Sequence, residues 1–144
     1  MTQTANRAND WKPMAIEGYM GSIGPLMRRK DESGKNRYGL LITPQHLNAI
    51  GLAHGGVITS LIDQVIALEA WNAADRQPTV TVQMDTRFVG SAKAESFLQA
   101  TAVIKHQTGS MMFVDADVHG DGDALIASAT SVMKIIRQKG KTSD

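Results

Sequence analysis

One apolar stretch, residues 54–71, constrains the fold of this chain more than any other. Its apolar side chains recur at the three- and four-residue spacing of an α-helix, which predicts a helix over about residues 56–74. These side chains are Val57, Ile58, Leu61, Ile62, Val65 and Ile66. The apolar face is broad, so the helix is expected to be buried on several sides. A lone helix of this kind cannot cover its own apolar surface and needs other elements packed around it.

The residues after this helix alternate between apolar and polar side chains, as half-buried β-strands do. The four segments with this pattern are 80–88, 94–106, 112–119 and 124–136. The connections between them contain glycine with serine, threonine or aspartate, which favours hairpin turns. These predicted turns are Gly90-Ser91, Thr108-Gly109-Ser110 and Gly120-Asp121-Gly122. The second half of the chain is therefore expected to be an antiparallel sheet.

Two shorter strands are predicted ahead of the helix, over residues 23–30 and 36–43, with Ser33-Gly34 as the turn between them. Together the pattern predicts an α+β fold, in which a curved antiparallel sheet of about six strands wraps one long central helix. The domain is expected to cover residues 22–137.

Both ends of the chain are expected to lie outside this domain. Residues 1–21 are predicted to be an N-terminal extension, in which Asp10 caps a short helix and Pro13 occupies its first turn. Residues 138–144 are predicted to be a polar tail.

Composition excludes several classes of function. The net charge of +1 gives no support for nucleic-acid binding, which needs a clearly basic face. The absence of cysteine excludes disulfides, thiolate nucleophiles and cysteine-ligated metals. The polar start lacks the apolar run of a signal peptide, and no stretch approaches the ~18 apolar residues of a membrane span. A cytoplasmic protein that does not enter the membrane is expected.

No metal site or cofactor is predicted. The four histidines have no spacing typical of metal ligands. The segment that begins at Asp115 resembles a calcium loop, but its twelfth position is Ile126 instead of the bidentate glutamate that such loops need. The alternating apolar residues favour a strand that ends in a turn.

The junction His54-Gly55-Gly56 directly precedes the predicted helix and is suited to an acyl-transfer site. Two glycines let the backbone turn tightly and let another group approach closely. The free N–H groups and positive dipole end of a helix start favour an oxygen that carries negative charge. Such preorganised donors can stabilise the oxyanion of an acyl-transfer transition state by roughly 3–4 kcal/mol.

Asp63, on a polar strip of the same helix, is the candidate acid–base group. It follows Gly55 by eight residues, so it lies about 12 Å further along the helix axis. It cannot act on a carbonyl held by its own helix start. A two-fold dimer with antiparallel helices would bring Asp63 of one chain to Gly55 of its partner. If both groups are catalytic, the sequence requires a homodimer; otherwise Gly55-Gly56 is a turn and Asp63 belongs to a buried polar network.

The segment from Leu47 to Asp63 resembles the hotdog-fold acyl-CoA thioesterases of the phenylacetic-acid-degradation type. The shared pattern is an Asn, a Gly, His-Gly-Gly, and then a Leu and an Asp along the helix. In this chain these residues are Asn48, Gly51, His54, Gly55, Gly56, Leu61 and Asp63. The likeness extends more loosely over residues 22–137. It implies a hotdog fold that hydrolyses acyl-CoA without a cofactor, as a dimer or a dimer of dimers.

The resemblance also implies roles for individual residues. Asp63 is expected to be the general base or nucleophile, and Gly55 to donate its N–H to the thioester carbonyl. Asn48 is expected to position the carbonyl or the attacking water, and Thr81 to assist that water. The substrate-binding residues are expected to be His54, Gly56, Phe88, His106, Gly109, Ser110, Met111 and Lys134. The nucleotide is expected against the loop at 106–111, which contains neither Lys nor Arg.

Two other functional classes stay open. The first is a non-catalytic acyl-CoA-binding or regulatory module on the same fold, which would not require a carboxylate beside the thioester. The second is an acyl dehydratase or hydratase, whose pairing of a histidine with an acid in a different motif is not found here. The sequence does not define the acyl chain or distinguish CoA from a carrier protein.

Overall fold

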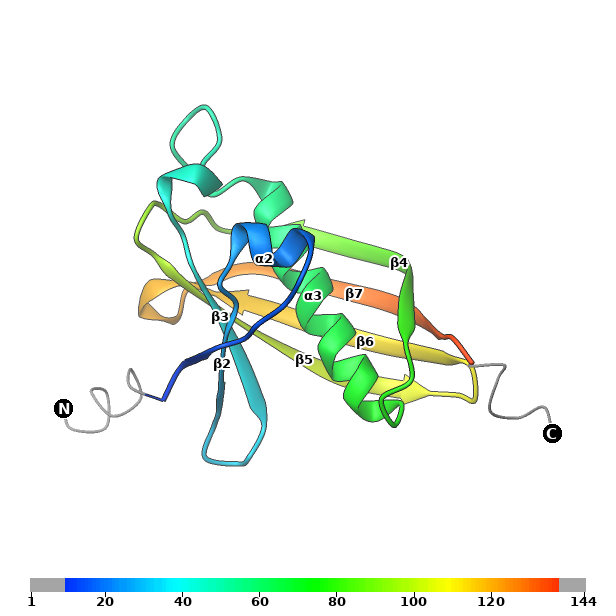
Figure 1. Ribbon diagram of the computed structural model, residues 1–144. Helices are drawn as coiled ribbons and strands as arrows, with labels where there is room; N and C mark the ends of the chain where they lie inside the picture. The colour runs from blue at the N-terminus through cyan, green and yellow to red at the C-terminus, as the bar shows by residue number, and fades with distance from the viewer. Residues whose placement is uncertain (1–9, 138–144) are drawn as a thin grey trace.

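The computed structural model describes residues 10–137, and its centre is the long helix α3 (Gly55–Ala73). A curved antiparallel sheet wraps this helix (Figure 1). Its strands are β1 (Lys12–Pro13), β2 (Met27–Lys30), β3 (Asn36–Leu41), β4 (Thr79–Phe88), β5 (Phe97–Gln107), β6 (Met111–His119) and β7 (Leu125–Ile135). The spatial order is β1-β2-β3-β5-β6-β7-β4. The predicted hotdog fold of class α+β is confirmed, with seven strands in the sheet instead of about six.

The core lies between α3 and the concave face of the sheet. All six apolar side chains that predicted the helix are at most 9% exposed. They pack with residues from the inner faces of β3, β5, β6 and β7, such as Leu40, Leu98, Val114 and Met133. Burial of each Val, Leu, Ile or Met side chain contributes roughly 1.5–3 kcal/mol, which is why α3 is held firmly against the sheet.

One of the three predicted hairpin turns is wrong. Gly90-Ser91 follows β4, but β4 pairs with β7 at the edge of the sheet, so the chain must cross to reach β5 in the interior. The crossing segment is tied down by backbone hydrogen bonds, from Gly90 N–H to Ile126 and from Ala53 N–H to Ala92. Glycine and serine mark an irregular connection, but they do not specify which strand comes next.

The other two predicted turns are confirmed. Thr108–Ser110 joins β5 to β6, and the segment around Gly122 joins β6 to β7 through the short 3-10 helix η2 (Asp121–Asp123). Gly122 has φ +67°, a conformation that glycine adopts without steric cost.

The predicted N-terminal helix is wrong in position. Lys12 and Pro13 form β1, which pairs with β2, and the only helix in this region of the described chain is α2 (Tyr19–Ile23). Because Ile23 ends α2 and Pro25 has no N–H to contribute to a strand ladder, β2 begins at Met27 and not at residue 23. The predicted polar tail, 138–144, lies outside the described residues.

Strand β4 contains a bulge that the sequence pattern did not show. The register of its pairing with β7 shifts between Thr81 and Gln83. The extra residue places Thr81 and Met84 on the same side of the strand, toward the helix and core. Val80 and Val82, which the simple alternation assigned to the core face, are 47% and 56% exposed.

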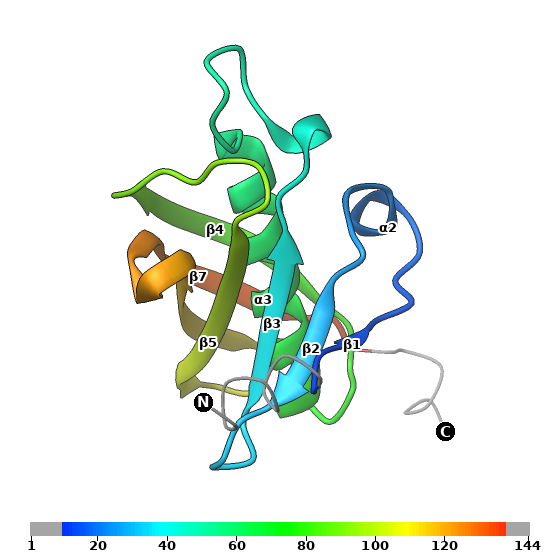
Figure 2. The same ribbon diagram turned by 90° about the vertical axis from the view of Figure 1, so that its left-hand side faces the viewer.

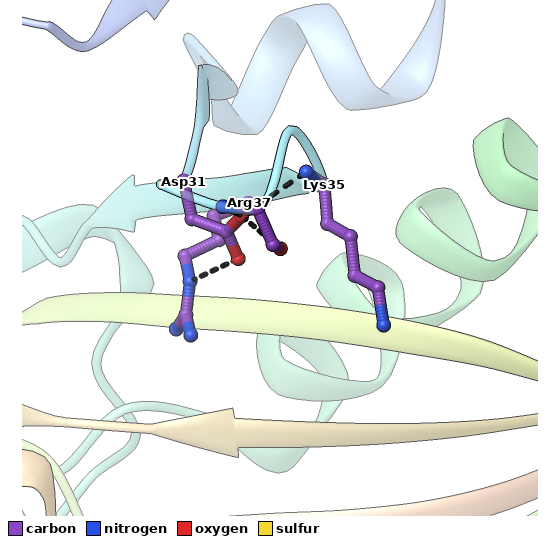
Figure 3. Close-up of polar contacts among 4 residues, drawn as sticks. Asp31, Lys35 and Arg37 are labelled. Atoms are coloured by element: carbon purple, nitrogen blue, oxygen red, sulfur yellow. Dashed lines mark hydrogen bonds and ion pairs between the residues drawn. The ribbon is translucent and has the colours of Figure 1, made fainter.

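The turn between β2 and β3, predicted at Ser33-Gly34, is confirmed and is organised by Asp31 (Figure 3). One carboxylate oxygen of Asp31 accepts hydrogen bonds from the Ser33 hydroxyl (2.6 Å), the Ser33 N–H (2.9 Å) and the Lys35 N–H (3.0 Å). The other oxygen lies 3.4 Å from Nε of Arg37. These donors, the Ser33 hydroxyl first, lower the pKa of Asp31 from 3.8 to about 2.

This turn makes folding stability depend on pH. Because the pKa of Asp31 is lower in the folded state, its stabilisation is complete above about pH 4 and is lost as the pH falls through about 2. Asp31→Asn should therefore lower the melting temperature at pH 6, and the difference from wild type should shrink between pH 4 and pH 2. Thermal unfolding followed by circular dichroism over this range is the measurement. A difference that is constant with pH would contradict the assignment.

No helix within residues 10–137 combines the length and the apolar character that crossing a membrane requires.

Candidate functional site

The start of α3 offers an unused hydrogen-bond donor. His54 is the N-cap, and its Nδ1 accepts a hydrogen bond from the Gly56 N–H at 2.8 Å. The His54 carbonyl accepts from the N–H groups of Val57 and Ile58. The Gly55 N–H has no acceptor among the described residues. This N–H, at the positive end of the helix dipole, is free to bind an oxygen anion.

Phe88 lies beside this donor. A Cβ atom built on Gly55 would meet the Phe88 ring at 3.5 Å, an ordinary contact distance. Phe88 ends β4, and its side chain is 52% exposed. The aromatic ring therefore forms an apolar wall next to the Gly55 N–H.

Asp63 and Thr81 are paired. The Thr81 hydroxyl donates a hydrogen bond to Oδ1 of Asp63 at 2.7 Å. Asp63 is half-buried, and Thr81 on the edge strand β4 is exposed. The β4 bulge makes this contact possible, because it keeps Thr81 on the helix side of the strand. The result is a carboxylate with one oxygen oriented by a hydroxyl group, at an open edge of the sheet.

A single chain keeps these two groups apart. Gly55 begins α3 and Asp63 follows eight residues later, about 12 Å along the helix axis. Phe88 and Thr81 are likewise well separated, seven residues apart on β4, which runs antiparallel to the helix. One chain therefore carries two separate candidate half-sites, one at the Gly55 N–H and one at the Asp63 carboxylate.

Asn48 has a structural task in the loop before α3. Its Oδ1 accepts hydrogen bonds from the N–H groups of Ile50 and Leu52, both at 3.0 Å, and these bonds close the loop around Gly51 at φ +83°. Its side-chain NH₂ group donates to no acceptor within residues 10–137. The amide can therefore hold the loop with its oxygen and still present a donor.

His46 also fixes the loop before the helix, and the sequence interpretation missed it. Its Nδ1 accepts from the Thr43 N–H (3.0 Å), so Nε2 carries the proton and donates to the Ile23 carbonyl (2.7 Å). Its own carbonyl accepts from the His54 N–H. The spacing Thr43-x-x-His46 around Pro44 is that of a capping box and was the available signal.

A second carboxylate on α3 serves the fold. Glu69 accepts hydrogen bonds from the Tyr38 hydroxyl (2.6 Å) and from Nδ2 of Asn36 (3.1 Å). Burial raises the pKa of Tyr38 well above its ordinary value, and the negative charge of Glu69 adds to the effect. Glu69 faces β3, whereas Asp63 faces β4, so the two carboxylates occupy different sides of the helix.

The remaining predicted substrate-binding residues gather at the β5–β6 turn, at the end of the sheet that faces the C-terminal end of α3 (Figure 1). The Thr108 hydroxyl oxygen accepts from the Ser110 and Met111 N–H groups and shapes this turn. Met111 is the register partner of Lys134 on β7. The ring of His106 contacts that of Phe113, with 6.0 Å between their centroids. This group lies away from Gly55 and Phe88 within the same chain.

The described residues contain no group of three or more His, Asp or Glu side chains placed to hold a metal ion.

Comparison with known proteins gives the family. The family profile described as the thioesterase superfamily matches residues 50–127. A candidate esterase of Pseudomonas aeruginosa is 31% identical over 114 residues, which cover 78% of this chain and 84% of that protein. Human acyl-coenzyme A thioesterase 13 is 27% identical over 96 residues, which cover 67% of this chain and 69% of that protein.

A solved structure supports the same fold. A Bacillus halodurans protein crystallised with CoA superposes with a TM-score of 0.78 at 23% identity, over 95% of this chain and 87% of that one. The matched profile spans α3, β4, β5 and β6 and ends in the first residues of β7. The chain therefore belongs to the thioesterase superfamily, with the hotdog fold that its sequence predicted.

Proposed function

We propose that the chain hydrolyses the thioester bond of acyl-CoA to a free acid and CoA. The observation that carries this proposal is the Asp63–Thr81 pair at 2.7 Å, beside an open sheet edge. A carboxylate oriented by a hydroxyl group is suited to activate water or to attack a carbonyl. The name of the human relative and the CoA in the Bacillus halodurans structure support acyl-CoA as the substrate class.

The active unit of this proposal is a two-fold homodimer. Asp63 needs an oxyanion donor that its own chain holds about 12 Å away. Within the described residues, β4 pairs on one side only, with β7, and it exposes Val80 and Val82 at its free edge. Exposed apolar edge strands favour pairing with another chain, and a two-fold axis beside β4 would set the helices antiparallel. Each site then combines Asp63 and Thr81 of one protomer with Gly55 and Phe88 of the other, and two such dimers associate as a tetramer.

Each residue has a physical task in the reaction. The Gly55 N–H binds the carbonyl oxygen and stabilises the negative charge that develops on it. Asp63 either takes a proton from a water molecule that attacks the carbonyl carbon, or attacks that carbon itself and forms an acyl-enzyme anhydride that water then hydrolyses. The Thr81 hydroxyl orients the carboxylate for either step. In this proposal the Asn48 NH₂ group positions the carbonyl or the attacking water, while its oxygen holds the loop. CoA leaves as a thiolate, which needs little protonation because thiols ionise with a pKa of about 8.5.

Substrate binding extends from the reacting carbonyl in two directions in this proposal. His54 and Gly56 define the helix start, and Phe88 packs beside the carbonyl site. The nucleotide end of CoA binds at His106, Gly109, Ser110, Met111 and Lys134, around the β5–β6 turn. The shape of this turn is held by a hydrogen bond from the Met111 N–H to the Thr108 hydroxyl oxygen and by the pairing of β6 with β7.

Replacing Thr81 tests the orientation of the carboxylate. Thr81→Val keeps the shape but removes the hydroxyl donor to Asp63, so kcat should fall about tenfold or more, as the loss of a charge-assisted hydrogen bond predicts. Thr81→Ser keeps the donor and is the matched control, with kcat close to that of wild type. Steady-state kinetics with one acyl-CoA is the measurement. Equal kcat for the Val and Ser variants would exclude the role.

A panel of CoA thioesters tests the function itself. Purified protein should release CoA from short, long and aryl acyl-CoA at different rates, as followed by a thiol reagent. Tight binding of acyl-CoA without turnover would favour the alternative, a regulatory acyl-CoA-binding module. Consumption of enoyl-CoA with no release of CoA would favour a hydratase.

A further inference from the structure

His46 lies at the base of the loop that leads into α3, and its side chain is buried. Only 5% of the residue is exposed, so the imidazole is not open to a substrate. The ring instead joins two segments that are far apart in the sequence. Nδ1 accepts from the Thr43 N–H, which follows β3, and Nε2 donates to the Ile23 carbonyl at the end of α2. One neutral ring with a fixed tautomer therefore ties α2 to the start of this loop.

The backbone of His46 closes the base of the same loop. Its carbonyl accepts a hydrogen bond of 2.8 Å from the His54 N–H, and an isolated β-bridge joins Leu47 to Ala53 just inside that bond. The loop between the two histidines carries Asn48, whose amide is a candidate donor to the substrate. The position of this amide therefore depends on where the side-chain hydrogen bonds hold His46.

The position of the Gly55 N–H depends on His54. This N–H belongs to the same planar peptide unit as the His54 carbonyl. The carbonyl and Nδ1 of His54 accept hydrogen bonds from N–H groups in the first turn of α3, and its N–H donates to the His46 carbonyl. Of these anchors only the His46 carbonyl lies outside α3. It therefore sets the place of the helix start relative to the loop.

We infer that His46 is a positioning residue, which holds the Asn48 amide and the Gly55 N–H where the proposed hydrolysis requires them. This inference rests on the proposed function. His46 touches none of the reacting groups, so its loss should lower kcat and leave substrate binding almost unchanged. Small displacements of catalytic groups are costly, since a shift of about 1 Å can lower a rate by ~10²-fold.

The test compares three variants of His46 with wild type on one acyl-CoA. His46→Ala removes both side-chain hydrogen bonds and should lower kcat about tenfold or more, with KM changed by less than about twofold. His46→Asn keeps an acceptor near the place of Nδ1, and His46→Gln keeps a donor near that of Nε2. Each should recover part of the lost kcat. Equal kcat in all three variants would exclude the hydrogen bonds as the cause and overturn the inference.

Tyr38→Phe is the matched control for lost stability. It removes another buried hydrogen bond against the central helix, from the Tyr38 hydroxyl to Glu69 at 2.6 Å. It should lower the melting temperature, as His46→Ala does, and leave kcat unchanged. Comparable losses of kcat in the two variants would show that weakened folding is sufficient, and His46 would have no positioning role.

A double variant tests whether His46 acts through the helix start. Gly55→Pro removes the N–H that His46 is inferred to position. In this background His46→Ala should lower kcat by a smaller factor than it does in wild type, because residues that act as a unit are not additive. The same fold-loss in both backgrounds would overturn the inference.

Amide hydrogen exchange separates this inference from the proposed function. If wild type releases CoA from no acyl-CoA, the proposed function fails, but the coupling between His46 and His54 can still be measured. The His54 N–H should exchange about tenfold faster in His46→Ala than in wild type, and Tyr38→Phe should leave its exchange unchanged. Unchanged exchange in His46→Ala would refute the coupling, and with it the inference.

Discussion

Asp63→Asn is expected to lower kcat for acyl-CoA about 10²–10⁴-fold, the range typical of losing a positioned base. The amide is close to the carboxylate in size, and its oxygen can still accept from the Thr81 hydroxyl, so the fold and the position of the side chain should persist. What is lost is the negative charge that attracts a proton from water or attacks the carbonyl directly. Because the charge acts on the reacting atoms and not on binding, KM should change far less than kcat.

Glu69→Gln is the matched control for this experiment. It neutralises the other half-buried carboxylate of α3, which accepts from Tyr38 and Asn36 on the far side of the helix. It should lower the melting temperature and leave kcat unchanged. Comparable losses of kcat in the two variants would point to a general effect of charge in α3, and wild-type activity in Asp63→Asn would remove Asp63 from the reaction.

Predicting the central helix and predicting the Asp63–Thr81 pair required different kinds of information from the sequence. The helix was predictable because its apolar spacing is a local property, and all six of those side chains are buried. The junction was predictable because two glycines directly precede the apolar residues with helical spacing, whereas the His54 N-cap is seen only in the structure. The contact between Asp63 and Thr81 was not predictable from spacing, since it joins residues of two different elements that are 18 positions apart in the sequence. Only the resemblance to a family placed the two residues in one site.

Two of the errors in the predicted fold concern β4. The alternation of apolar residues would place Val80 and Val82 on the same face as Met84. A bulge between Thr81 and Gln83 changes which side chains face the core, so Val80 and Val82 are exposed. The sequence also did not show that β4 pairs with β7 and not with β5, because a turn signal carries no information about long-range partners. Figure 2 shows the consequence, with the segment after β4 crossing over to β5.

Gly55→Pro is expected to lower kcat about 10²–10³-fold, because it removes one backbone donor from the oxyanion site. Gly55 is the first helical residue, a position where proline is well tolerated. The preceding residue, His54, already has φ −62° and ψ 136°, the extended conformation that proline requires before it. The Gly55 N–H serves no acceptor within the described chain, so its removal should cost little stability. Gly55→Ala keeps the N–H and adds a Cβ at an ordinary 3.5 Å from Phe88, so it should retain most of the activity.

Mixing the two inactive variants tests whether the site is shared between protomers. If Asp63 of one chain works with Gly55 of the other, a dimer of Asp63→Asn with Gly55→Pro has one site with both lesions and one with none. Random assortment after co-refolding makes about half of the dimers mixed, and each mixed dimer has one intact site out of two. About a quarter of wild-type activity should therefore return. Each variant refolded alone should stay inactive and dimeric by light scattering. If both half-sites belonged to one chain, every site in the mixture would carry a lesion and no activity would return. The recovered activity therefore shows whether Asp63 acts with the Gly55 of a second chain or with the Gly55 of its own chain, which lies about 12 Å away along the helix.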